Sequence, residues 1–155
     1  MRTLSELVAE AETRIERREP AAALAAMGEG ALLVDLRGQA ERERDGVVPG
    51  SLHVPRTVLE WRFDPAGSWR NGAAADPGRR ILLLCDHGYS SVLAAATLVD
   101  LGYVHAGDVI GGFEAWVAAG LPVEPAPPQP DGLPGMGQPP TSEATPETPV
   151  VSSTS

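Results

Sequence analysis

The sequence predicts an α/β protein with a mainly parallel central sheet flanked by helices. The clearest indication is residues 81–84, Ile-Leu-Leu-Leu, a run of branched aliphatic side chains that is typical of a strand buried on both faces. A helix with one apolar face follows this run, because its apolar side chains recur at helical spacing. That face carries Val92, Ala95, Ala96 and Val99. Residues 31–36 provide a second apolar strand signal.

The loop between the predicted strand and helix contains Cys85, the single cysteine of the chain. Backbone N–H groups and the positive end of the helix dipole converge at the N-terminus of a helix. A thiol at that position should ionise easily. Cys85 is therefore the candidate nucleophile.

Residues 85–91, Cys-Asp-His-Gly-Tyr-Ser-Ser, resemble the active-site loop of the rhodanese family of sulfurtransferases. In that family a cysteine opens a six-residue loop whose N–H donors surround the sulfur. The loop is closer to those of small single-domain thiosulfate sulfurtransferases than to those of the long two-domain enzymes. Other segments resemble the N-terminal and C-terminal signatures of the family. These segments are residues 33–37 with 46–55, and residues 111–116 with 120–123.

The resemblance implies a rhodanese-like three-layer fold and a transferase without a cofactor or metal. It would move a sulfane sulfur from thiosulfate or a related small anion to a thiol or cyanide, through a persulfide on Cys85. Cysteine suits this role because it attacks sulfur and then leaves as a thiolate. The chain has no second cysteine to resolve the persulfide. We therefore expect an external acceptor, a small thiol or the thiol of a partner such as a thioredoxin-like protein.

The resemblance also implies the other site residues. The loop residues expected to bind the donor are Asp86, His87, Gly88, Tyr89, Ser90 and Ser91. Arg56 and Arg62, together with Arg70, are candidates for a cationic wall around the anion, because their segment lies over the loop in the family's fold. Asp35 and Arg37 are expected to support loops beneath the site through ion pairs.

Asp86 departs from the arginine that many thiosulfate-using members of the family carry directly after the cysteine. Its negative charge should oppose both a thiolate and an arriving dianion. We therefore predict weak use of thiosulfate.

Three other functions are compatible with a cysteine loop. A cysteine phosphatase or arsenate reductase needs a wider, seven-residue loop closed by an arginine, whereas residues 85–90 here number six and no arginine closes them. A non-catalytic binding or redox-sensing module is the second alternative. Zinc binding is disfavoured, since Cys85, His53, His87 and His105 lack ligand-like spacing.

Composition limits the classes of binding partner and the location that we expect for the protein. The formal net charge is −9, and all 12 basic residues are arginines, which argues against a nucleic-acid or anionic-membrane surface. One cysteine cannot form an internal disulfide, which fits a reducing compartment. No stretch has the length of a membrane span, and the first residues lack an apolar signal region. These features favour a cytoplasmic location.

The chain divides into three predicted parts. Residues 1–30 are expected to be a helical extension whose first helix ends near residues 17–19, and which either packs on the domain or forms a homodimer surface. Residues 31–123 are the rhodanese-like domain, in which the mixed-charge run 41–45 should be solvated. Residues 124–155 are rich in proline, serine and threonine, so we expect a disordered tail whose removal leaves the melting temperature unchanged.

Overall fold

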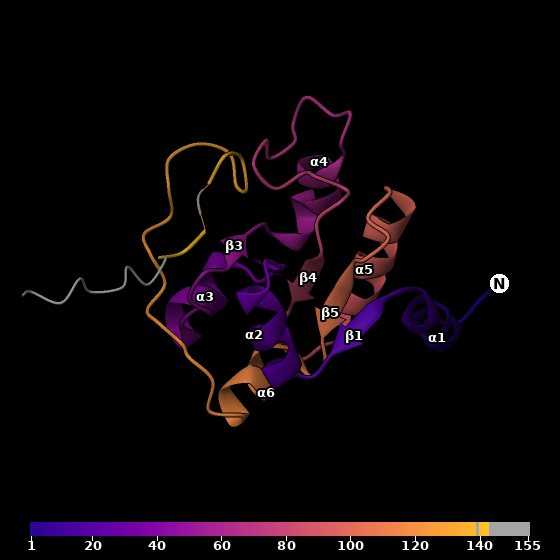
Figure 1. Cartoon of the computed structure of the whole chain (residues 1–155), viewed down its shortest axis with the longest axis horizontal. Coiled ribbons are helices and arrows are strands. Elements are labelled where there is room, and N and C mark those ends of the chain that lie inside the picture. Colours follow the sequence, from indigo (N-terminus) through magenta and orange to yellow (C-terminus); the bar gives the residue numbers. More distant parts are fainter. Residues whose placement is uncertain (139, 143–155) are drawn as a thin grey trace, which may run out of the picture.

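The computed structural model describes residues 1–138 and 140–142, and in this part of the chain a five-stranded parallel sheet lies between two layers of helices (Figure 1). The strand order is β1-β5-β4-β2-β3, and each neighbouring pair is parallel. The strands are β1 (Glu16–Arg18), β2 (Leu32–Asp35), β3 (Leu52–His53), β4 (Ile81–Leu84) and β5 (Gly107–Val109). The helices are α1 (Leu4–Arg14), α2 (Pro20–Gly28), α3 (Gln39–Asp45), α4 (Leu59–Phe63), α5 (Ser90–Asp100) and α6 (Gly112–Ala118), with a 3₁₀ turn η1 (Arg56–Val58). The predicted α/β fold is confirmed.

The central strands β2 and β4 are buried on both faces, because successive side chains of a strand point to opposite sides. One face packs against α4 and α5, and the other against α2 and α6. All four residues of β4 are fully buried. At about 1.5–3 kcal/mol for each fully buried aliphatic side chain, burial of this strand contributes about 6–12 kcal/mol to stability. Burial on both faces explains why its sequence is uninterruptedly aliphatic.

The N-terminal segment differs from the prediction. α1 begins with the predicted capping box, in which Thr3 Oγ1 accepts a hydrogen bond from the Glu6 amide at 3.1 Å. The helix ends at Arg14, however, and not near residues 17–19. Glu16–Arg18 instead forms the edge strand β1, paired with β5. Three consecutive charged residues show no apolar alternation, so the sequence pattern did not indicate a strand.

The C-terminal segment also differs from the prediction. Thr141 takes part in two backbone hydrogen bonds beside β3, accepting from the Gly50 amide at 3.0 Å and donating to the Ser51 carbonyl at 2.8 Å. Glu124 forms a bridge with Val47. Figure 1 shows this segment passing α3 and β3. Disorder is therefore wrong for residues 124–138 and 140–142, while residues 143–155 lie outside the described residues.

None of the helices in the described part of the chain combines the length and the hydropathy that crossing a membrane requires.

Candidate active site

The cysteine loop lies at the carboxyl end of β4, the edge at which open α/β sheets bind ligands. Cys85 directly follows β4, and the loop ends where α5 begins. The Gly88 amide donates a hydrogen bond to Cys85 Sγ at 3.2 Å, and Sγ lies 3.3 Å from Ser91 Oγ. Only 7% of Cys85 is exposed. The loop therefore encloses the sulfur and surrounds it with hydrogen-bonding groups.

These contacts favour the thiolate. Burial opposes ionisation of the Cys85 thiol, but hydrogen bonds from the side chain and amide of Ser91, the Ser90 hydroxyl and the Gly88 amide outweigh it. The pKa of Cys85 therefore lies below its ordinary value. This direction agrees with the expectation of a thiol that ionises easily at the start of a helix.

Behind the sulfur, two residues that the sequence analysis missed extend the hydrogen-bond chain. Ser91 Oγ donates to Asp108 Oδ2 at 2.7 Å, and Asp108 is fully buried. Arg17, from β1, holds the same carboxylate through Nε to Oδ1 at 2.9 Å and Nη2 to Oδ2 at 3.2 Å. The signal that could have found this pair is Asp108 itself, since a carboxylate in a buried strand requires a charged partner.

The N-terminus of α6 fixes the loop from the other side. The Phe113 amide donates to the Cys85 carbonyl at 2.8 Å, and the Glu114 amide donates to the Asp86 carbonyl at 3.0 Å. A Cβ on Gly112 would lie 2.4 Å from the Cys85 carbonyl oxygen. Only glycine permits this approach.

An open pocket of about 310 Å³ lies in front of the cysteine. Of the predicted loop residues, it is lined by Cys85, Asp86, His87, Tyr89 and Ser90. Arg37 also lines it, together with Leu36, Gly38 and Glu41. The His87 ring is exposed, and its Nδ1 lies 2.6 Å from Glu114 Oε2. This pairing does not place the ring as a base for the enclosed thiol.

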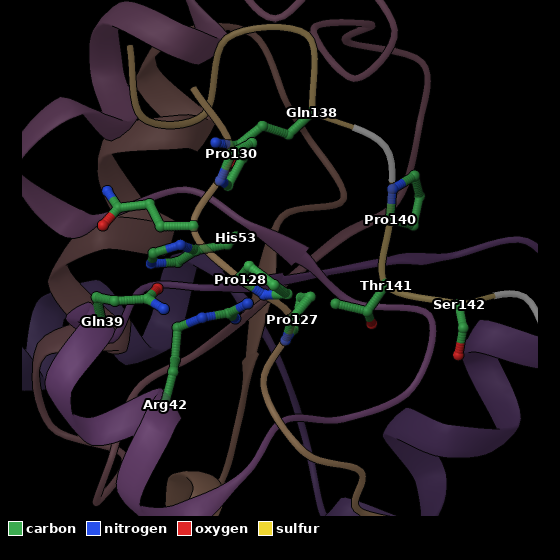
Figure 2. Close-up of a pocket in the computed structure, with 11 residues that line it drawn as sticks. Gln39, Arg42, His53, Pro127, Pro128, Pro130, Gln138, Pro140, Thr141 and Ser142 are labelled. Atoms are coloured by element: carbon green, nitrogen blue, oxygen red, sulfur yellow. The ribbon is translucent and has the colours of Figure 1, made fainter. Parts of the chain in front are cut away.

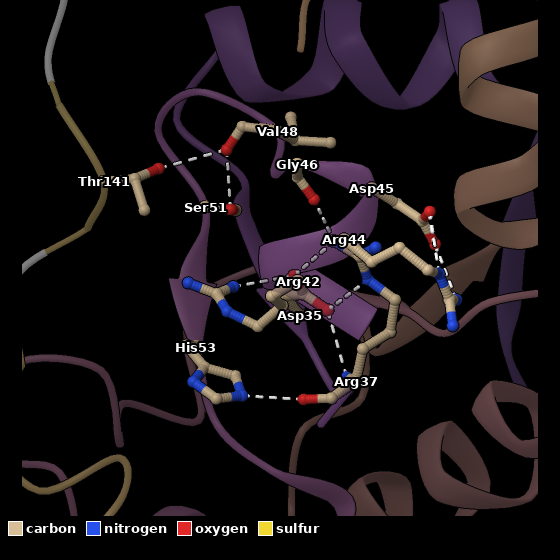
Figure 3. Close-up of polar contacts among 10 residues, drawn as sticks. All are labelled: Asp35, Arg37, Arg42, Arg44, Asp45, Gly46, Val48, Ser51, His53 and Thr141. Carbon is tan, nitrogen blue, oxygen red and sulfur yellow. Dashed lines mark hydrogen bonds and ion pairs between the residues drawn. The ribbon is translucent and has the colours of Figure 1, made fainter. Parts of the chain in front are cut away.

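Asp35 and Arg37 form the expected ion pair beneath this pocket (Figure 3). Arg37 Nε lies 3.1 Å from Asp35 Oδ1 and Nη2 lies 3.0 Å from Oδ2, and the guanidinium lies 3.8 Å from the centre of the Phe113 ring. Arg42 shares the carboxylate at 2.7 Å. The solvated run predicted for residues 41–45 is therefore wrong at Arg42, which α3 directs inward and which is 2% exposed.

The predicted cationic wall is not assembled at this pocket. Arg56 pairs with Glu60 one helical turn away. Arg62 is 5% exposed and donates to the carbonyl of Pro134 at 2.6 Å, and Arg70 lies exposed in the following loop. None of these arginines lines the cavity in front of Cys85.

No group of three His, Cys, Asp or Glu side chains that could hold a metal ion occurs within residues 1–138 and 140–142. Of the histidines considered as zinc ligands, His87 lines the Cys85 pocket, whereas His53 and His105 do not.

Comparison with known proteins identifies the family. The family model of the rhodanese-like domain matches residues 19–119 of this chain. Thiosulfate sulfurtransferase GlpE of Actinobacillus succinogenes is 36% identical over 98 residues, which cover 63% of this chain and 79% of the relative. The same-named protein of Pseudomonas savastanoi is 34% identical over 106 residues, covering 68% and 91%.

A solved structure from Rhodopseudomonas palustris, described as a protein of unknown function and possible tyrosine phosphatase, superimposes with a TM-score of 0.73 and 34% identity over 80% of this chain and 96% of that one. These comparisons confirm the predicted resemblance and a rhodanese-like transferase. The chain belongs to the rhodanese-like domain family.

Proposed function

We propose that the protein is a sulfurtransferase that carries a sulfane sulfur as a persulfide on Cys85. Membership of the rhodanese-like family and the names of the GlpE relatives support sulfur transfer in general. The observation that carries the proposal is the enclosure of Cys85 Sγ, which accepts a hydrogen bond from the Gly88 amide at 3.2 Å and, as a thiol, donates to Ser91 Oγ at 3.3 Å. Hydrogen-bond donors fixed around a sulfur stabilise negative charge on it, both as thiolate and as persulfide.

In the first half-reaction, the Cys85 thiolate attacks the outer sulfur of thiosulfate. A bond forms between Sγ and that sulfur, the sulfur–sulfur bond of thiosulfate breaks, and its electron pair leaves on sulfite. In the second half-reaction, an acceptor thiolate or cyanide attacks the outer sulfur of the persulfide, and Cys85 leaves as a thiolate. The cycle consumes no oxidant or reductant.

The acceptor must come from outside the chain, since Cys85 has no second cysteine beside it. The open pocket in front of Cys85 suits either a small thiol or the exposed thiol of a protein such as a thioredoxin-like partner. A homodimer formed through the N-terminal segment stays a prediction.

The phosphatase alternative is less well supported by the site. A phosphate bound in a cysteine loop needs an arginine free to grip two of its oxygens. Arg37 lines the pocket, but Asp35 already holds its guanidinium through two hydrogen bonds. The short loop and the engaged arginine therefore favour sulfur transfer over phosphate hydrolysis.

Intact mass spectrometry after incubation with thiosulfate tests the proposal. The wild type should gain the mass of one sulfur atom, and cyanide should remove it. Cys85→Ser should gain nothing while keeping its melting temperature, because serine fits the same loop. Absence of an adduct on the wild type would favour a non-catalytic module, and efficient hydrolysis of p-nitrophenyl phosphate would favour a phosphatase.

A further inference from the structure

A second pocket, separate from the Cys85 cavity, lies between α3, β3 and the C-terminal segment (Figure 2). Its volume is about 240 Å³. Arg42, His53 and Gln39 form one wall, and prolines of residues 127–130 form much of the other. None of the loop residues 85–91 lines it. Sulfur transfer therefore does not account for this pocket.

The wall of this pocket contains a buried positive charge that is not fully compensated. Asp35 contributes −1, and Arg37 and Arg42 contribute +1 each, so the cluster carries a net charge of +1. Their exposed fractions are 0%, 4% and 2%. Arg42 Nε has no hydrogen-bond partner among the described residues. An uncompensated buried cation is costly unless another negative group approaches it.

The Arg42 charge is not opposed elsewhere in the described lining of the pocket. No carboxylate belongs to its described lining, although the chain as a whole is acidic. The Nε2 atom of His53 lies 2.7 Å from the Arg37 carbonyl, which anchors the ring against the arginine cluster (Figure 3). Burial, and then the charge of Arg42, lower the pKa of His53, and the neutral ring, whose proton lies on Nε2 against this carbonyl, adds no positive charge to the pocket.

The opposite wall indicates what kind of anion fits. Pro127, Pro128 and Pro130 present apolar rings to the cavity, facing the guanidinium of Arg42 and the ring of His53 (Figure 2). Apolar walls with a few convergent polar groups are typical of sites for small organic molecules. A hydrated inorganic ion would leave the proline wall unused.

We propose that this pocket binds a small organic anion, a carboxylate with a short apolar body. The carboxylate lies against Arg42, and the apolar body lies against the His53 ring and the prolines of the C-terminal segment. The ligand supplies the negative charge that Asp35 alone does not.

The wild-type protein can be titrated with sodium butyrate while the ring signals of its histidines are followed by NMR. Butyramide, which has a similar shape without the charge, and sodium chloride at equal ionic strength are the controls. Butyrate should shift the signals of His53, but not those of His87 or His105, with a Kd of about 1–10 mM for so small a ligand. A response no larger than that to butyramide or chloride overturns the proposal.

Two variants of α3 provide a matched pair. Arg42→Met removes the buried charge, whereas Arg44→Met removes an exposed one that pairs with Asp45. Butyrate affinity should fall by about tenfold or more in the first and change by less than about twofold in the second. Retained affinity in a folded Arg42→Met protein overturns the proposal, and so does sodium sulfate binding as tightly as butyrate. Should Arg42→Met fail to fold, the wild-type comparison of butyrate with butyramide decides.

Discussion

Two fully buried aspartates lie in environments that differ in net charge. Asp108 is held by one arginine, Arg17, and accepts a hydrogen bond from Ser91, so its charge is balanced within this pair, while Glu12 lies 3.7 Å from the same guanidinium. Asp35 is shared by two arginines, and its cluster remains positive. A balanced pair orients a hydrogen-bond chain without adding net charge next to a thiolate, whereas an unbalanced cluster attracts an anion. The number of arginines per carboxylate distinguishes the two sites.

The largest effect should come from removing the carboxylate of the positive cluster. Asp35→Asn leaves Arg37 and Arg42 buried without a counter-charge, and breaking such a pair costs about 3–5 kcal/mol of unfolding free energy. Urea denaturation measures the loss. Asp45→Asn, on the exposed end of α3, is the control and should hardly move the midpoint. A similarly small change for Asp35→Asn would show that the two arginines do not depend on this carboxylate.

The next effect concerns the C-terminal segment, which closes the pocket of the positive cluster. Truncation after Glu124 removes the carbonyl acceptors of Arg62 and of Asn71, and the pairing of Thr141. Exchanging each of these hydrogen bonds for water costs about 0.5–1.5 kcal/mol, so the melting temperature should fall by roughly 5 °C or more. This reverses the expectation of an unchanged melting temperature. Truncation after Ser142 keeps all of these contacts and serves as the control.

Removing either charge of the Arg17–Asp108 pair should change the pKa of Cys85, in opposite directions. Ser91 donates its hydroxyl hydrogen to Asp108, so this carboxylate competes with a Cys85 thiolate for it. Asp108→Asn should therefore lower the pKa of Cys85, and Arg17→Met, which leaves the carboxylate uncompensated, should raise it. Each change should move the pH midpoint of thiol alkylation by about one pH unit. Arg14→Met, an exposed arginine on α1, is the control. Shifts in the same direction would refute the balance of charges described here.

The smallest effect should come from Asp86, a carboxylate in the Cys85 pocket with no ion pair among the described residues. Asp86→Asn should lower the KM for thiosulfate by about three- to tenfold, because it removes repulsion between this side chain and the dianion. Steady-state kinetics at low and high salt measure the change, and the gain should shrink as salt screens the charges. A gain independent of salt would point to loop geometry in place of charge.

The parts of the fold that the sequence predicted are those in which neighbouring residues share one environment. The aliphatic run of β4 and the helical spacing of α5 identified the strand, the helix and the position of Cys85 between them. The parts that it missed depend on partners far along the chain. Arg17 and Asp108 are 91 residues apart, and nothing near Arg17 indicates a strand.

The pattern of charged and polar residues along the sequence also did not show which side chains are buried. Arg42 lies in a run of alternating charges that is typical of a solvated helix, and only the carboxylate at the end of β2 draws it into the interior. The proline-rich composition of residues 124–142 does not reveal the hydrogen bonds that Arg62 and Asn71 donate to it.

The charged strand β1 also affects how the protein behaves in concentrated solution. An exposed sheet edge offers unpaired backbone groups to other chains, and long apolar edges promote aggregation. Here one edge of the sheet is β1, which consists of Glu16, Arg17 and Arg18. The other edge is the two-residue strand β3, and the backbone of Thr141 pairs with the residues that directly precede this strand. A foreign strand would find charged side chains at the first edge and little free backbone at the second. The same segments that complete the two sites thus protect the sheet from pairing with its own copies.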